Sequence, residues 1–397
     1  MTALLETVGP HIQDGSRALA YIFPLPGRIG HLVLEPLALM NLYGESHAPI
    51  VVITHDARLH KHSTGVRRLL EPHMTIAQTM KRKLISLGHV DAGAVEIGPM
   101  TWLLSTHDAL QRDLVLALES GKPLRYLTAP EDLLAEGRDL IRSMGYEDDK
   151  PSVVLHVRDE QFLPQFTHNF FRAARVADYM PAIDYLLSKG YRIFRLGDPS
   201  SVAVTHPSRD FVDLPHHPNY RDILDVYCIA TARFSITCSS GPEAIVRAMN
   251  RPMVMVNGYA QYDQWMNPGD LLLFKTYRDK ATGRPLSYDE ILARDLFLEN
   301  TVAGFENQGV LLEDNRPEEV LDAVMEMEAR LNGAFVPESS LEDRFAELSV
   351  RHLDRFRRNL PERGPGDFAR IETYAYALPW TRYCQSFLEK NAWFLNS

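Results

Sequence analysis

Two arginines at the ends of apolar runs are the residues of this sequence whose type and position first suggest chemistry. Arg158 follows the run VVLHV and Arg195 lies inside YRIFRLGD, so parallel strands would carry both to one edge of a sheet. An arginine that leaves a buried strand needs an anionic partner, and its planar guanidinium binds the oxygens of a diphosphate in pairs. The alternative is an ion pair with a neighbouring carboxylate, Asp159 or Asp198, that holds loops together.

Three small residues follow another apolar run, FSITC, and precede a helix. Ser239, Ser240 and Gly241 form this break, and Pro242 takes the first helical position, where its fixed φ fits and its missing N–H costs nothing. Such a turn presents backbone N–H groups and the positive end of a helix, which suits a phosphate. The alternative is an ordinary strand-to-helix turn with a serine-rich cap.

Two further charged residues are candidates for the same site. Glu243 stands in the first helical turn, where the helix dipole alone favours a carboxylate, and where acidic residues also accept hydrogen bonds from ribose hydroxyls. Lys275, in LLLFKTY, would add a positive charge to a diphosphate site or would cap a strand. Both interpretations stay open for each side chain.

The elements that must position these residues alternate between strands and helices. Apolar runs and amphipathic segments follow one another in the order β-α-β-β-α-β-α-β from 152 to 257, with the first helix at about 170–189. This order predicts a doubly wound α/β domain with right-handed crossovers. Residues 259–287 are rich in turn formers and aromatic residues, which predicts a loop over a ligand.

The N-terminal part predicts another parallel βα unit. Strands at 17–23 and 49–54 flank the loop PLPGRIGH and a helix of about 31–43. Ligands of open α/β sheets bind at the carboxyl ends of such strands, which is where Gly27, Arg28 and Gly30 would lie. These glycines do not match GxGxxG, so a dinucleotide site is weakly supported.

A histidine-rich segment, HDARLHKH, follows the strand at 49–54. It gathers His55, Asp56, His60 and His62, but their spacing matches no known set of metal ligands. A solvated helix start is the preferred interpretation, and we predict no metal site.

Composition limits the class of protein. The 397 residues, 45% hydrophobic and 24% charged, suffice for two globular domains, and the net charge of -10 argues against a nucleic-acid groove. Three cysteines without a CxxC pair indicate neither a disulfide framework nor a zinc ribbon. No signal peptide or membrane-spanning run is evident, so we expect a cytoplasmic protein, with peripheral contact with the inner membrane left open.

The charged break YEDDKP, 146–151, predicts the domain boundary. We expect a Rossmann-like acceptor domain at 1–149, a Rossmann-like donor domain at 150–335, and a helical tail at 336–397 that packs back on the first domain.

Several blocks resemble a known family in their order and spacing. HVRDE, FRLGD and RFSITCSSGPEAIVRAMNRPMVMVN are similar to bacterial glycosyltransferases of surface-polysaccharide functions, and HVRDE resembles the arginine motif of fucosyltransferases. The likeness covers about 150–330, and the first domain only through PGRIGHL. It implies a GT-B fold, in which two Rossmann-like domains face a cleft and the second binds the nucleotide of a sugar donor through Arg158, Ser239, Ser240, Gly241 and Glu243.

The loop PGRIGH is similar to the glycine-rich first loop of the N-acetylglucosaminyltransferase of peptidoglycan synthesis, which ends in a histidine, although it has fewer glycines. If the reaction inverts the anomeric centre, a general base must take a proton from the acceptor hydroxyl. His31, Asp159 and Glu160 are the candidates, with His31 ahead because the ordinary pKa of histidine lies nearest neutral pH. The alternative for His31 is a helix-start side chain satisfied by its loop.

Together, these expectations predict a metal-independent glycosyltransferase without a bound cofactor. Its donor would be a nucleotide-diphosphate or CMP sugar, and its acceptor a carbohydrate, a lipid-linked or a small-molecule hydroxyl compound. A sugar-nucleotide epimerase of the same fold and a non-catalytic nucleotide-sugar binding protein are the alternatives, because a fold alone does not fix a function.

Overall fold

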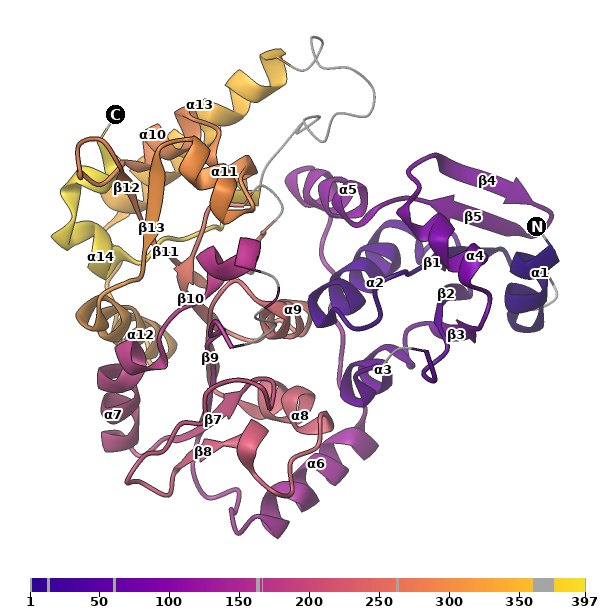
Figure 1. The fold of residues 1–397 in the computed structure, drawn as a ribbon, viewed down its shortest axis with the longest axis horizontal. Coiled ribbons are helices and arrows are strands. Elements are labelled where there is room, and N and C mark those ends of the chain that lie inside the picture. Colours follow the sequence, from indigo (N-terminus) through magenta and orange to yellow (C-terminus); the bar gives the residue numbers. More distant parts are fainter. Residues whose placement is uncertain are drawn as a thin grey trace. The chain divides into compact units, whose positions relative to one another are not determined.

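A computed structural model of the chain describes residues 2–12, 15–59, 62–161, 165, 167–261, 264–359 and 375–396. The chain divides into two compact units, coloured along the sequence in Figure 1. The first consists of Met1–Gly145, Arg221–Ala230 and Ala248–Asn250, and the second of Tyr146–Tyr220, Thr231–Arg247 and Arg251–Ser397. The chain passes from the first unit to the second after Gly145, close to the predicted boundary at 146–151. The sequence analysis did not predict that 221–230 and 248–250 belong to the first unit.

The first unit contains a five-stranded sheet in the order β3-β2-β1-β5-β4. All neighbours are parallel except β4, which pairs antiparallel with β5. The strands are β1 (Ala18–Ile22), β2 (Ile50–His55), β3 (Thr75–Thr79), β4 (Gly93–Ile97) and β5 (Met100–Leu104). Its helices are α1 (Thr2–Val8), α2 (Ile29–Tyr43), α3 (Thr64–Leu70), α4 (Arg82–Ile85), α5 (His107–Glu119) and α6 (Glu131–Ser143).

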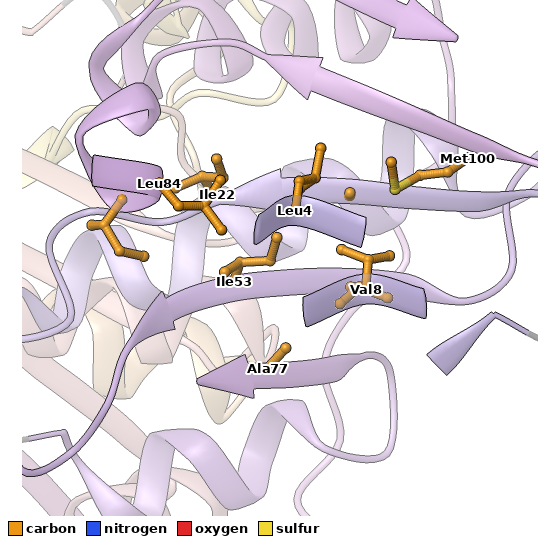
Figure 2. Packing of buried hydrophobic residues seen from close by; sticks show 10 residues of the cluster. Leu4, Val8, Ile22, Ile53, Ala77, Leu84 and Met100 are labelled. Carbon is orange, nitrogen blue, oxygen red and sulfur yellow. The ribbon is translucent and has the colours of Figure 1, made fainter. Parts of the chain in front are cut away.

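The N-terminal helix α1 covers part of this sheet. Leu4 and Val8 are four residues apart and thus lie on one helix face, and both are fully buried in a cluster with Ile22, Ile53 and Ala77 from three strands. Figure 2 shows both side chains directed at the sheet. The sequence analysis did not predict this helix.

The second unit contains a six-stranded parallel sheet. Its order β8-β7-β6-β9-β10-β11 corresponds to the 3-2-1-4-5-6 order of Rossmann folds. The strands are β6 (Ser152–His156), β7 (Arg192–Leu196), β8 (Phe211–Asp213), β9 (Phe234–Thr237), β10 (Met253–Gly258) and β11 (Leu271–Phe274). Helices α7 (Met180–Ser188), α8 (Ile223–Thr231) and α9 (Gly241–Ala248) lie between them in the chain. The predicted α/β class with two Rossmann-like, doubly wound units is confirmed.

Two details differ from prediction. The helix expected at about 170–189 begins at Met180, because the preceding residues form short 3-10 helices, η3 (Thr167–Arg172) and η4 (Val176–Tyr179). The segment expected to be a loop contributes β11 and β12 (Thr276–Asp279), and β12 pairs with β13 (Val310–Glu313). Helices α10 (Tyr288–Ala293), α11 (Val302–Asn307) and α12 (Pro317–Leu331) complete this part of the unit.

The C-terminal tail belongs to the second unit. Helices α13 (Ser339–Asn359) and α14 (Gln385–Lys390) are assigned there, and Tyr383 forms a parallel bridge with Leu272 of the edge strand β11. The Tyr383 hydroxyl accepts the Phe274 backbone N–H at 3.0 Å. The prediction that 336–397 packs on the first domain is therefore wrong for the described residues, because this tail covers the free edge of β11.

Each sheet has one point at which the strand order reverses. In the first unit this switch point lies between β1 and β5, and in the second between β6 and β9. Ligands of open α/β sheets bind outside the carboxyl ends of the strands at such points. Among the described helices, none is long and apolar enough to cross a membrane.

Gly137 provides a test of how α6 packs against α8, whose residues 223–230 belong to the first unit. A Cβ at Gly137 of α6 would lie 2.4 Å from Cγ of Tyr227 in α8, so Gly137→Ala must displace the tyrosine ring. We expect the free energy of unfolding to fall by about 1–3 kcal/mol, as for other overpacked sites. Urea denaturation measures it. In an open helix Gly→Ala stabilises by roughly 1 kcal/mol, so an unchanged or higher stability would contradict this packing.

Candidate functional site

The carboxyl ends of β6 and β9 lie side by side at the switch point of the second unit. The strands pair in parallel with Leu155 opposite Ile236, and the chain leaves them through Arg158 and Cys238. The Arg158 backbone N–H donates to the Cys238 sulfur at 3.3 Å. Arg158 is therefore adjacent to the turn formed by residues 239–241.

This turn presents unused backbone donors. Within the described residues, no acceptor takes the backbone N–H of Ser239, Ser240 or Gly241, and Pro242 has none. The Glu243 N–H reaches the Ser240 carbonyl at 3.2 Å. Since α9 begins at Gly241, these N–H groups are the unsatisfied donors of a helix N-terminus, which favour an anion.

Two more cations are fixed around the turn by the end of η3 and the residues that follow it. The Arg172 Nε donates to the Ser239 carbonyl at 2.8 Å, and Lys275 Nζ donates to the Ala173 carbonyl at 2.5 Å. The next residue, Ala174, donates its backbone N–H to the Arg158 carbonyl at 2.8 Å. Three consecutive residues thus connect Arg158, the Ser239 turn and Lys275. We call Arg158, Arg172 and Lys275 the cationic cluster.

The charges of all three cations act on the pKa of the buried Cys238 thiol. Burial raises its pKa, and the opposing influences come from the Arg158 backbone N–H and from the charges of Arg172, Arg158 and Lys275. Lys275 is the most compensated of the three, because its Nζ also pairs with Asp314 Oδ1 at 2.5 Å and is almost fully buried. The two arginines are half-buried.

Arg195 does not belong to this cluster. It lies inside β7 with no exposed surface, and its Nη1 binds Asp213 Oδ1 at 2.6 Å, while Nη2 binds Ser201 Oγ at 3.2 Å and lies 3.8 Å from Asp159 Oδ2. The structure therefore assigns it the alternative role, an ion-pair centre that holds loops together. The expectation of donor binding by Arg195 is corrected on this geometry, because its charge is enclosed by carboxylates.

Glu243 also has a structural partner. Both of its carboxylate oxygens accept from Arg247, four residues along α9, at 2.7 Å each, and both side chains are buried. Arg247 Nη1 in turn donates to the Trp265 carbonyl at 3.0 Å. A ribose hydroxyl would have to share oxygens that already accept charged hydrogen bonds, so this ion pair is the better account of Glu243.

Two candidate bases lie on the loop after β6. Asp159 is buried, and its oxygens accept the backbone N–H groups of Gln161 at 3.0 Å and Val202 at 2.8 Å. Glu160 is exposed in a turn. Asp159 thus stabilises the loop, whereas the Glu160 side chain is exposed to solvent.

The switch point of the first unit contains the third candidate base. β1 and β5 pair in parallel, with Tyr21 opposite Leu103. The loop after β1 exposes Gly27 and Arg28, and α2 begins at Ile29, which places Gly30 and His31 in its first turn.

His31 is part of a cluster that the sequence analysis missed. Its Nδ1 lies 3.1 Å from Glu35 Oε1, and Nδ1 of His107, at the start of α5, lies 3.2 Å from the same oxygen. The other oxygen, Oε2, accepts the Tyr21 hydroxyl at 2.5 Å. The two imidazole rings lie 4.0 Å apart between centroids. We call these four side chains the imidazole cluster.

Glu35 is an ionised carboxylate in a buried position. Burial would raise its pKa, but hydrogen bonds and the charges of His107 and His31 prevail and lower it to about 2. The pKa of Tyr21 is raised strongly by burial and by the Glu35 charge, so its hydroxyl stays protonated and donates. An ionised carboxylate is acceptor-only, so the Tyr21 hydroxyl donates to it.

His31, Glu35 and His107 also present one ligand atom each within 4.8 Å of one another, as a divalent metal would require. Among the described residues this is the group with that arrangement. The HDARLHKH segment behaves differently: Asp56 binds Nε of Arg58 at 2.8 Å, and His60 lies outside the described residues.

Two missed features carried weak sequence signals. His31 and Glu35 are four residues apart on a predicted helix, which puts them on one face and could have indicated a pair. His107 comes from α5, and only the parallel pairing of β5 with β1 brings it near. Arg172 was placed inside a predicted helix, which concealed its position over the Ser239 turn.

No family model and no curated protein matches the sequence. Several solved structures resemble the fold weakly. A glycosyl transferase family 9 protein from Veillonella parvula gives a TM-score of 0.35 at 11% identity, over 61% of this chain and 80% of that chain. ADP-heptose lipopolysaccharide heptosyltransferase II of E. coli gives 0.35 at 12%, over 60% and 83%.

The iron-containing heptosyltransferase TibC, solved with ADP-D-beta-D-heptose, gives a TM-score of 0.40 at 12% identity, over 81% of this chain and 78% of that chain. With TM-scores below 0.5, these likenesses do not identify the activity of the chain.

His156, at the end of β6, tests the electrostatics of the site. Burial, followed by the nearby charges of Arg195 and Arg158, lowers its pKa to about 4, and its Nδ1 lies 3.2 Å from the Leu196 carbonyl. Between pH 6.5 and about 4 the unfolded chain therefore binds more protons at this position than the folded chain. The free energy of unfolding should therefore decrease as the pH is lowered through this window, by about 3 kcal/mol for this group.

His156→Asn keeps a donor for the Leu196 carbonyl and removes the titration. We expect the variant to lose less stability than the parent between pH 7 and 4.5 in urea denaturation. Parallel pH profiles for the two proteins would refute a neutral, buried imidazole at this site.

Proposed function

We propose that the protein is a glycosyltransferase that moves a sugar from a nucleotide-diphosphate sugar to a hydroxyl acceptor. The observation that supports this most is the convergence of the cationic cluster and three unused backbone N–H groups at the switch point of a Rossmann-ordered sheet. Guanidinium groups and backbone amides bind phosphoryl oxygens.

The cationic cluster would stabilise the leaving group. As the bond between the anomeric carbon and the diphosphate breaks, its electron pair and a negative charge pass to the nucleoside diphosphate. Arg158, Arg172 and the amides of 239–241 would stabilise this charge, with Lys275 in support. Preorganised donors supply the stabilisation that a cation otherwise supplies, so we propose a metal-independent reaction. Two guanidinium groups suit two phosphoryl groups better than the single phosphate of a CMP sugar.

We assign the general base to His31. Its side chain is 31% exposed, whereas Asp159 uses both oxygens within its loop and Glu160 lies in solvent. The acceptor proton would pass to His31 as the acceptor oxygen attacks the anomeric carbon, which implies inversion. In this proposal the two units form a GT-B enzyme, with the donor on the second unit and the acceptor on the first, near Gly27, Arg28 and Gly30.

The remaining parts of the proposal concern partners and location. We propose a carbohydrate, lipid-linked or small-molecule acceptor, no bound cofactor, and a cytoplasmic protein that can contact the inner membrane peripherally. A surface-polysaccharide pathway would supply such an acceptor.

Arg172→Ala should weaken binding of a nucleoside diphosphate about 10- to 100-fold, because a charged hydrogen bond contributes roughly 1.5–3 kcal/mol. Calorimetric titration in EDTA measures the affinity. Arg175→Ala is the matched control, because this arginine is exposed and pairs with Asp178 at 3.0 Å. Equal affinities of the two variants would contradict the assignment of Arg172.

A thermal-shift screen against ADP, UDP, GDP, dTDP, CMP and their sugars tests the function itself. We expect at least one diphosphate to raise the melting temperature without metal. Product analysis with and without an acceptor then separates transfer from epimerisation, and binding without turnover would indicate a non-catalytic protein. A screen in which nothing stabilises the fold would contradict the proposal.

A further inference from the structure

The imidazole cluster gathers side chains from three elements of the first unit around one carboxylate oxygen. Tyr21 comes from β1, His31 and Glu35 from α2, and His107 from α5. Nδ1 of His31 lies 3.1 Å and Nδ1 of His107 lies 3.2 Å from Glu35 Oε1, and these three atoms all lie within 4.8 Å of one another. Two imidazole nitrogens and one carboxylate oxygen therefore share a small volume.

The spacing of these atoms suits the ligands of a zinc-sized ion. Tetrahedral zinc bonds nitrogen and oxygen at about 2.0–2.1 Å, which places neighbouring ligand atoms roughly 3.3 Å apart. Both nitrogen–oxygen separations in the cluster are close to this value. The limit of 4.8 Å between the two nitrogens leaves an adjustment that side-chain rotations can supply. Two histidines and one glutamate, with a further position open to water, are also a common protein ligand set for zinc.

The carboxylate is oriented by neighbours that would not touch the ion. Glu35 Oε2 accepts the Tyr21 hydroxyl at 2.5 Å, which leaves Oε1 to face the two imidazoles. Hydrogen bonds of this kind orient ligating carboxylates in metal sites. His31 and Glu35 are four residues apart in α2, so the helix holds both side chains on one face. Most of the site is therefore in place without an ion.

The burial of the carboxylate also favours a cation here. Glu35 is only 2% exposed, and a buried carboxylate is costly unless a positive charge accompanies it. Among the described residues, neither a lysine nor an arginine pairs with Glu35. The side chains of His31 and His107 are 31% and 18% exposed, so an ion has access from solvent.

We infer that His31, Glu35 and His107 bind a divalent first-row metal of the Zn2+ type, and that this ion inhibits the transferase by occupying His31. Imidazole nitrogens suit Zn2+, whereas Mg2+ and Ca2+ prefer oxygen ligands. The inhibition rests on the proposed function, in which His31 is the general base. An imidazole bound to a metal through Nδ1 carries its proton on Nε2, so neither nitrogen can accept the proton of the acceptor hydroxyl. The ion regulates a transfer reaction that itself needs no metal.

The metal site is tested by calorimetric titration of the full chain, freed of metal by chelation, with Zn2+ alone. We expect one Zn2+ per chain, with two imidazole ligands in its X-ray absorption spectrum. His107→Gln should weaken binding by about 100-fold or more, because the loss of an outer partner alone costs roughly 10- to 100-fold. Tyr21→Phe removes such an outer partner and should have this smaller effect, and it decides the question if circular dichroism shows that His107→Gln does not fold.

His62→Gln is the matched control, because it removes an imidazole from the other histidine-rich segment, HDARLHKH. This variant should bind Zn2+ as tightly as the parent. The absence of Zn2+ binding would overturn the inference and leave the cluster as a pair of histidines that neutralise a buried carboxylate. A loss in His62→Gln equal to that in His107→Gln would also overturn it.

Inhibition is measured as the initial rate of transfer at a series of buffered free Zn2+ concentrations, with the donor found by the thermal-shift screen. Each protein is compared with its own rate in chelator. The parent should lose activity as the site fills, and His107→Gln should need about 100-fold more Zn2+ for the same loss. Equal sensitivity of the two proteins would overturn inhibition through this site. If no donor is turned over, the proposed function fails, whereas the titration still decides whether the metal site exists.

Discussion

Parallel pairing between two strands that are far apart in the sequence is the constraint on which both clusters depend. β6 pairs with β9 and β1 with β5, and β7 and β8 lie on the other side of β6 as β2 and β3 lie on the other side of β1. Each switch point therefore brings together the segments of chain that leave two strands distant in sequence. The polar side chains gather at this place in both units, which is the expected position for a ligand of such a sheet.

The two clusters use this position in opposite ways. In the second unit, positive charge and unused amides surround the end of β9. The charges of the three cations lower the pKa of the buried Cys238 thiol against the effect of burial. In the first unit, the buried Glu35 carboxylate accepts the Tyr21 hydroxyl and lies beside the imidazoles of His31 and His107. The arrangement in the second unit suits an anionic group.

The sequence predicted the strands better than the partners of the polar residues. Apolar runs bounded by turn signals placed β6, β9 and β10 correctly, because strands buried on both faces are continuous in composition. Arg158 and the Ser239 turn were found because each follows such a run. Arg195 looked equivalent, but its enclosure depends on the pairing of β7 with β8, which brings Asp213 beside it, and on the path of the loop that carries Asp159. The same holds for Arg172, which lies over the turn only because the chain forms 3-10 helices there, and for His107, whose neighbours come from another strand. The tail was misplaced because aromatic composition indicates burial and not the surface that provides it.

The position of a bound diphosphate is the most direct test of the central claim, that the end of β9 is an anion site. A crystal structure of the complex with the nucleoside diphosphate that stabilises the fold would show it. The account predicts phosphoryl oxygens within hydrogen-bonding distance of the Arg158 and Arg172 guanidinium groups and of the backbone N–H groups of residues 239–241, with no metal between them. A diphosphate bound elsewhere on the chain, or held only through a divalent cation, would contradict it.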